Sequence, residues 1–284
     1  MSCGAPPGAS LWCRGDEPLN ASIYWALLLA SIKAKMEYRA TFVFFLFALV
    51  FFYSAQIGTV LVVMSRFKSL NGWSIGEMAF LYGLLSFSQG VTMLFFSSLN
   101  NFETFIMQGT FDRFLTRPLN PLLQTLVAGF EVSSVAHFFI GTAGLWFGSR
   151  YAGVEWTGMK LFFLALVIIG AALIQGGVRI AVSAVAFWTT RNRSLVHTIV
   201  YSSKEFVMYP ITIYSLWIQV FLTVVFPIAF INFYPSHYFL SRDSSTILLN
   251  PVLQYLTPLV GVATFGLGYA LWVAGVNRYQ SAGS

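Results

Sequence analysis

Apolar residues in this chain form long runs that charged residues rarely interrupt. A helix needs about 20 apolar residues to cross the hydrocarbon core of a bilayer. Six runs reach this length; four are free of charge, and the others contain only Glu131 or only Arg179. The pattern predicts an all-α polytopic membrane protein with six transmembrane helices. The expected spans are residues 40–64, 78–99, 122–148, 161–189, 207–226 and 251–276.

The segments outside these spans have other patterns. Residues 1–20 carry charges and no long apolar stretch, which predicts a disordered N-terminal tail. Residues 21–38 begin apolar and end in charges, which is typical of a helix in the cytoplasmic membrane interface. A simple extension of the first span is the alternative. The last two apolar runs are too long for one span each and contain prolines, so we expect extra short structure between spans five and six. Residues 21–284 then form a single transmembrane domain.

A short amphipathic helix is predicted over residues 101–117, between spans two and three. Its apolar residues recur at helical spacing, apart from a step near Gly109, and Pro118 ends it. The segment suits either a helix lying in the membrane interface or a docking surface for a cytoplasmic partner. The apolar side comprises Phe102, Phe105, Ile106, Phe111, Phe114 and Leu115, and the polar side comprises Glu103, Asp112, Arg113 and Arg117.

Composition excludes several classes of protein. Of the 284 residues, 57% are hydrophobic and 9% are charged, against about 25% charged in a soluble domain. Such a chain does not cover a soluble globule with polar side chains, so we exclude a soluble enzyme, a disordered chain and a nucleic-acid binder. The net charge of +6 suits anionic lipid beside the loops. Counting Lys and Arg in alternate loops gives ten on the side of both termini and five on the other, which predicts cytoplasmic termini.

The chain lacks the motifs of catalysis. No Lys follows a Gly, so there is no phosphate-binding loop, and the three His lie on separate segments without ligand spacing. We therefore expect neither an enzyme nor a metal or cofactor site in this chain.

Two ions lie inside predicted spans, where a lone charge costs roughly 2.5–3.5 kcal/mol. Glu131 and Arg179 have opposite signs and similar expected depths. We expect a buried ion pair between spans three and four. There are two alternatives: one of these residues lines a transport route, or the two ions are unrelated.

Several stretches resemble one family of membrane proteins. They read KAKMEYR (33–39), NGWSIGEM (71–78), QGTFDRFLTRPLNPLLQ (108–124) and FPIAFINFYP (226–235). The chain resembles the bacterial ABC-2-type permeases, the six-span membrane subunits of ABC transporters with a type V exporter-like fold.

The resemblance implies partners and roles. Such permeases pair with an identical or related permease in the bacterial inner membrane and bind two separate ATPase subunits, which hold ATP and Mg. Residues 21–38 are similar in position to the family's elbow helix, 227–242 to its outer re-entrant helices, and 101–117 to its coupling helix. Export is the implied activity; an ion channel or secondary carrier is the alternative, and no substrate is predicted. The implied coupling residues are Glu103, Gly109, Phe111, Asp112, Arg113, Phe114, Arg117 and Pro118.

Overall fold

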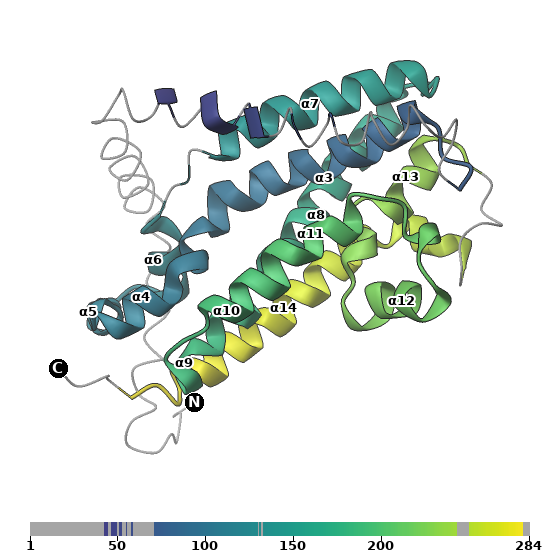
Figure 1. The fold of residues 1–284 in the computed structure, drawn as a ribbon. Helices are drawn as coiled ribbons and strands as arrows, with labels where there is room; N and C mark the ends of the chain where they lie inside the picture. Colours follow the sequence, from purple (N-terminus) through teal and green to yellow (C-terminus); the bar gives the residue numbers. More distant parts are fainter. Residues whose placement is uncertain are drawn as a thin grey trace.

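The computed structural model describes residues 71–129, 131, 133–242 and 250–280, with scattered helical positions between 43 and 58. The predicted tail (1–20), the interfacial helix (21–38) and most of the first span (40–64) lie outside the described residues. Figure 1 shows long helices side by side, with α5, α9 and the end of α14 at one end and α13 at the other. We call these the α5 end and the α13 end.

Helix α3 (Ile75–Phe96) runs from the α13 end to the α5 end. A capping box starts it: the Ser74 hydroxyl accepts from the Glu77 amide, and the Glu77 carboxylate accepts from the Ser74 amide at 2.7 Å. Its last turn continues through a 3-10 turn (Ser97–Asn101) into the short helix α4 (Phe102–Met107). The second predicted span is therefore extended at both ends.

Helix α7 (Ser133–Tyr151) packs antiparallel along α3 through glycines. A Cβ added at Gly83 would lie 2.4 Å from the Leu145 nitrogen, and one at Gly148 would lie 2.4 Å from the Phe80 nitrogen. Such close backbone approach is typical of helix pairs in membranes, where small residues maximise van der Waals contact.

The third predicted span (122–148) is wrong as a single helix. The chain forms α6 (Pro121–Val127), bends, and then forms α7. The bend is packed against α3's extension, because a Cβ at Gly129 would lie 2.9 Å from Ser98 Cβ and the Ser97 hydroxyl donates to the Gly129 carbonyl at 3.3 Å. Glu131 lies in this bend and not in a helix.

Helix α8 (Gly158–Ala184) continues into α9 (Ala186–Thr189) and runs parallel to α14 (Thr257–Val276). The two helices meet at Gly170 with Gly261 and, seven residues later on each, at Gly177 with Gly268. Pro258 lies in the first turn of α14, where its missing N–H is not needed, so it does not interrupt the sixth span.

The fifth predicted span (207–226) has the wrong boundaries. A continuous helical stretch begins earlier, as α10 (Arg193–Leu195), a π-helical segment (Val196–Tyr201) and α11 (Ser202–Val207). It ends at Val207 because Pro210 follows closely, and the buried Asn232 side chain donates to the Val207 carbonyl at 2.7 Å. Lys204, one of the ten cations assigned to the loops on the side of the termini, therefore lies within a helix.

Short helices then build the α13 end. They are a 3-10 turn (Ile211–Ile213), α12 (Leu216–Val220), a π-helical segment (Phe221–Val225), a 3-10 turn (Ile228–Phe230) and α13 (Phe233–Phe239), with another 3-10 turn (Pro251–Tyr255) before α14.

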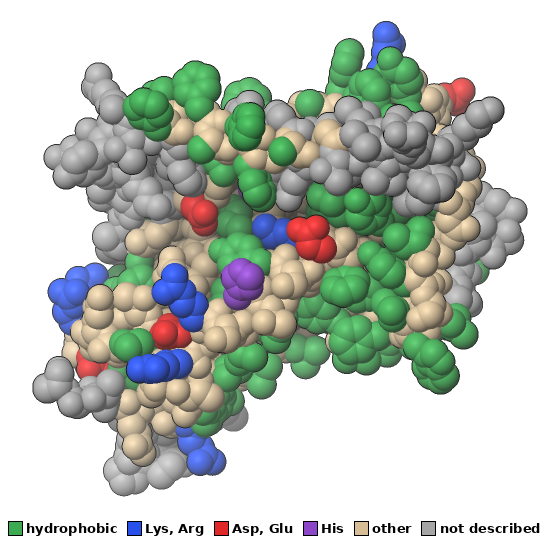
Figure 2. Space-filling view, in the orientation of Figure 1, with side chains coloured by type: hydrophobic (Ala, Val, Ile, Leu, Met, Phe, Trp, Pro, Cys, Tyr) green, Lys and Arg blue, Asp and Glu red, His purple; other side chains and the backbone are tan. Residues whose placement is uncertain are grey.

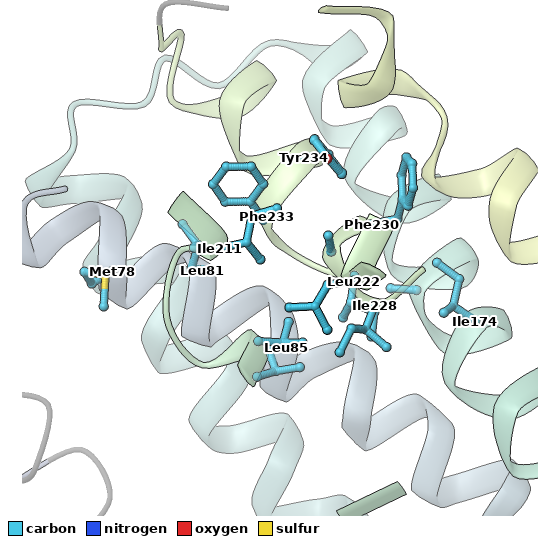
Figure 3. Packing of buried hydrophobic residues seen from close by; sticks show 14 of the residues in the cluster. Met78, Leu81, Leu85, Ile174, Ile211, Leu222, Ile228, Phe230, Phe233 and Tyr234 are labelled. Carbon is cyan, nitrogen blue, oxygen red and sulfur yellow. The ribbon is translucent and has the colours of Figure 1, made fainter. Parts of the chain in front are cut away.

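These short helices are bent relative to one another, and a hydrogen bond and apolar packing hold them against their neighbours. The helical stretches 216–225 and 228–239 meet at 81°, on either side of Phe226 and Pro227. The Thr257 hydroxyl donates to the Phe230 carbonyl at 2.8 Å. Figure 3 shows Leu222, Ile228, Phe230 and Phe233 gathered over Leu81 and Leu85 of α3. The re-entrant role of 227–242 stays a prediction.

Within the described residues, three helices are long and apolar enough to cross a membrane: 75–107, 158–189 and 257–276. The bent pair 216–239 is a fourth candidate. Figure 2 shows one face with apolar side chains gathered along its upper edge and toward the α13 end, and with several charged side chains near the α5 end. Acidic, basic and histidine side chains also lie in the middle of this face.

Candidate functional site

The predicted coupling segment forms two short helices, not one. Helix α4 ends at Met107 and α5 (Thr110–Leu115) begins after Gly109. Gly109 has φ +64°, a left-handed conformation that L side chains rarely adopt, so the single helix expected over 101–117 breaks here. The Gln124 side chain closes the far end by donating to the Phe114 and Leu119 carbonyls, both at 2.9 Å.

The resemblance implies a coupling role for Phe111, but the structure leaves its side chain no surface for a partner. Its side chain is 0% exposed and packs inside the chain. Its ring centroid lies 5.4 Å from that of Phe102, 5.2 Å from Phe187 and 5.2 Å from Tyr279. Phe111 thus joins α5 to α4, α9 and the segment after α14. Phe114 is half-buried at the edge of the same cluster.

The opposite face of α4 and α5 is open to a partner. Met107 is 52% exposed, and Arg113, Arg117 and Pro118 are exposed as well. The remaining exposed residues on this face are Thr104, Gln108 and Thr116. An exposed apolar side chain and two exposed cations on or just after two neighbouring short helices suit a docking surface.

The Glu103 side chain joins α4 to the start of the helical stretch 193–207, which follows α9. One carboxylate oxygen accepts from the Asn192 amide and from the Arg193 amide, each at 2.7 Å. These are amides of a helix N-terminus, which lack partners within the helix and favour a negative charge. The Asn192 side chain donates to the Val182 carbonyl at 3.0 Å, so the loop is also tied to α8. Sequence reasoning placed Glu103 on the polar side but missed this partner, which lies 89 residues away.

Asp112 faces the C-terminal segment. Burial and the negative charge of Asp112 raise the pKa of Tyr279 to about 12, so the phenol stays neutral at physiological pH. Together with the Phe111–Tyr279 contact, this holds α5 against the chain after α14.

Glu131 and Arg179, both described, do not form the expected ion pair: no salt bridge shorter than 4.0 Å joins them. Glu131 is half-buried in the bend before α7. Arg179 is 3% exposed, and its Nη1 donates to the Gln175 carbonyl at 3.3 Å. Among the described residues, Arg179 Nε and Nη2 have no hydrogen-bond partner. The prediction failed because it assumed that Glu131 continues a straight span.

Arg179 lines a cavity of about 30 Å³ between α3, α8 and α11. Gln89 and Lys204 contribute polar groups that sequence reasoning missed, and both Gln89 side-chain atoms are unpaired among the described residues. Next to it lies an apolar pocket of about 420 Å³, formed by α11, α12 and the two π-helical segments. The cavity and the pocket share Ser203, Phe226 and Ile228.

The long apolar helices, close glycine packing and apolar surface define an all-α polytopic membrane protein. The chain matches a family model described as ABC-2 family transporter protein over residues 49–283. The chain therefore belongs to the ABC-2 transporter family, and it is a membrane permease subunit of the ABC transporter class. This confirms the resemblance to ABC-2-type permeases and the prediction of an all-α polytopic membrane protein, while six spans and a bacterial origin stay predictions. Neither the curated proteins nor the solved structures provide a match to the chain.

Proposed function

We propose that this permease is the transport subunit of an ATP-driven exporter, and that two separate ATPase subunits dock on the exposed face of α4 and α5. ATP and Mg are held by those subunits, and the chain itself performs no catalysis. A second permease, identical or related, completes the translocation path. The protein resides in the bacterial inner membrane.

The Glu103 bridge carries this proposal. A force applied to α4 by an ATPase reaches the N-terminus of the 193–207 stretch through two charge-assisted hydrogen bonds of 2.7 Å. That stretch contains Ser203 and Lys204, which line the buried cavity. A direct mechanical connection therefore runs from the docking face to the middle of the membrane domain.

Charge supports the orientation. The α5 end holds five of the Lys and Arg residues that the structure describes, and the α13 end holds three. They are Arg113, Arg117, Arg191, Arg193 and Arg278 at the first, and Arg150, Lys160 and Arg242 at the second. An excess of cations is typical of the cytoplasmic side, where ATPases bind.

Co-purification tests the docking site. Met107→Ala combined with Arg113→Ala should reduce recovery of the ATPase with the permease and lower ATP-dependent transport. Loss of a central anchor in an interface costs about 2 kcal/mol or more. Arg150, an exposed cation in the last turn of α7, provides the matched control: Arg150→Ala should change neither ATPase recovery nor transport.

Full ATPase recovery and full transport by the double variant, with normal membrane insertion, would refute docking on this face. A channel or secondary carrier is the alternative function. It would be favoured if transport proceeded at the same rate without any ATPase.

A further inference from the structure

The cavity at Arg179 and the apolar pocket beside it differ in the side chains that line them. The polar side chains of the cavity are those of Arg179, Lys204, Gln89 and Gln175, whereas apolar side chains of α11 and α12 line the pocket. We infer that together they bind a single-chain anionic amphiphile, with its charged head at Arg179 and its acyl chain in the apolar pocket. Binding needs no ATPase, so the inference goes beyond the coupling proposed above.

The side of the Arg179 guanidinium that has no described hydrogen-bond partner favours an anionic head group. Nε and Nη2 form one side of the planar guanidinium, and among the described residues this side has no partner. Two parallel N–H groups match the two oxygens of a carboxylate or phosphate in a bidentate arrangement. A cavity of about 30 Å³ has room for about two oxygen-sized atoms.

The neighbouring groups strengthen this selection. Gln89 is buried with its amide nitrogen free of partners among the described residues, so it offers a further donor. Lys204 adds a second positive charge and lies 5.2 Å from the Tyr201 ring centroid. Buried donors without partners cost stability, which an anionic ligand recovers.

No carboxylate of the described residues occupies this place. Glu131 attracts Arg179 and Lys204 at longer range, and Glu205 attracts Lys204, but neither carboxylate lies within 4.0 Å of either cation. Residues 40–65, the predicted first span, contain no Asp or Glu. That stretch therefore brings no counter-charge to Arg179.

The apolar pocket suits an acyl chain. Its volume of about 420 Å³ lies within the range of small-molecule sites. Thr198 and Ile199 come from one π-helical segment, and Phe221 and Leu222 from the other. π-helical turns interrupt regular backbone bonding and occur frequently at functional sites. Figure 3 shows Leu85, Leu222 and Ile228 close together where the two spaces meet.

Competition with a fluorescent fatty acid tests the site. The full chain in detergent is titrated with cis-parinaric acid, and energy transfer from its tryptophans is recorded. Oleate, oleoyl lysophosphatidate and oleyl alcohol then compete. We expect either anionic competitor to displace the probe at about tenfold lower concentration than the alcohol does. The stronger anion identifies a fatty acid or a lysophospholipid as the source of the head group.

Variants locate the binding. Arg179→Lys keeps the charge but loses the bidentate edge, so the affinity for the preferred anion should fall about tenfold while alcohol binding is unchanged. Thr198→Trp places a ring in the pocket from an exposed position and should weaken all three competitors. Arg150→Lys is the matched control. Gln89→Leu removes the other proposed donor to the head group and should also lower the affinity for the anion. It tests the site if Arg179→Lys fails to fold.

Equal competition by the alcohol and both anions, or unchanged anion affinity in folded Arg179→Lys and Gln89→Leu, would overturn the inference. Because the assay contains no ATPase, its outcome is independent of whether docking on α4 and α5 fails.

Discussion

A single carboxylate oxygen of Glu103 lies 2.7 Å from the backbone nitrogen of Arg193, across two helices that are far apart in sequence. The same oxygen accepts from the preceding amide of Asn192. The contact satisfies two amides that a helix N-terminus leaves without internal partners. It therefore makes the orientation of α4 dependent on the helical stretch that follows α9.

Replacing Glu103 by Gln tests this contact. The variant keeps the shape but removes the charge, so we expect a loss of about 1–2 kcal/mol in unfolding free energy. Thermal unfolding in detergent measures it, with Glu155→Gln as the control at an exposed position of the α7–α8 loop. If Glu103 also transmits force, ATPase recovery should persist while transport falls. Equal melting temperatures for both variants would contradict a structural role for the bridge.

Phe111→Ala should act mainly on stability. The ring is fully buried in an aromatic cluster, and removing such a side chain costs about 3–5 kcal/mol. Phe139→Ala is the matched control, because Phe139 is a helical phenylalanine that is 74% exposed. The difference in melting temperature between the two variants is the measurement. A stable Phe111→Ala protein that fails only in ATPase binding would contradict this and favour direct contact between Phe111 and the ATPase.

Arg242 and Glu77 should stabilise the α13 end together. Their side chains form an ion pair at 2.6 Å, and the Arg242 guanidinium also lies 4.1 Å from the Trp73 ring centroid and donates to the Gly72 carbonyl. A double-mutant cycle with Glu77→Gln and Arg242→Gln should give a coupling energy of about 1 kcal/mol or more, because both groups are largely shielded from water. Additive effects of the two substitutions would show that the pair contributes no coupling.

The glycine contact between α8 and α14 offers a comparison within one helix. A Cβ at Gly268 would lie 2.4 Å from the Gly177 carbonyl oxygen, whereas one at Gly266 meets nothing within 4 Å. Gly268→Ala should therefore destabilise the protein by about 1–3 kcal/mol through overpacking. Gly266→Ala should be neutral or stabilising by up to about 1 kcal/mol, since alanine favours the helix. The free energies of unfolding of the two variants, measured under the same conditions, test this difference. Equal values would contradict the close packing at Gly268.

The sequence by itself determined the class of this protein. The length of the apolar runs, the scarcity of charge and the stretch around Pro118 each depend on local properties, and they sufficed for an all-α membrane permease of the ABC-2 family. The position of helical structure after α3 and a step in the apolar spacing near Gly109 were likewise visible in the residue pattern, although a single helix was predicted where the structure has two.

Tertiary structure alone decided which side chains meet. Phe111 and Met107 have similar local patterns, yet one is buried against α9 and the other exposed, because contacts with Phe187 and Tyr279 depend on elements distant in sequence. No described carboxylate lies within 4.0 Å of Arg179, because the chain bends at Gly129, where Ser98 of another element lies close. Hydropathy reports how much apolar surface a segment offers; only the packing of segments determines whether a buried charge finds a partner or faces a cavity.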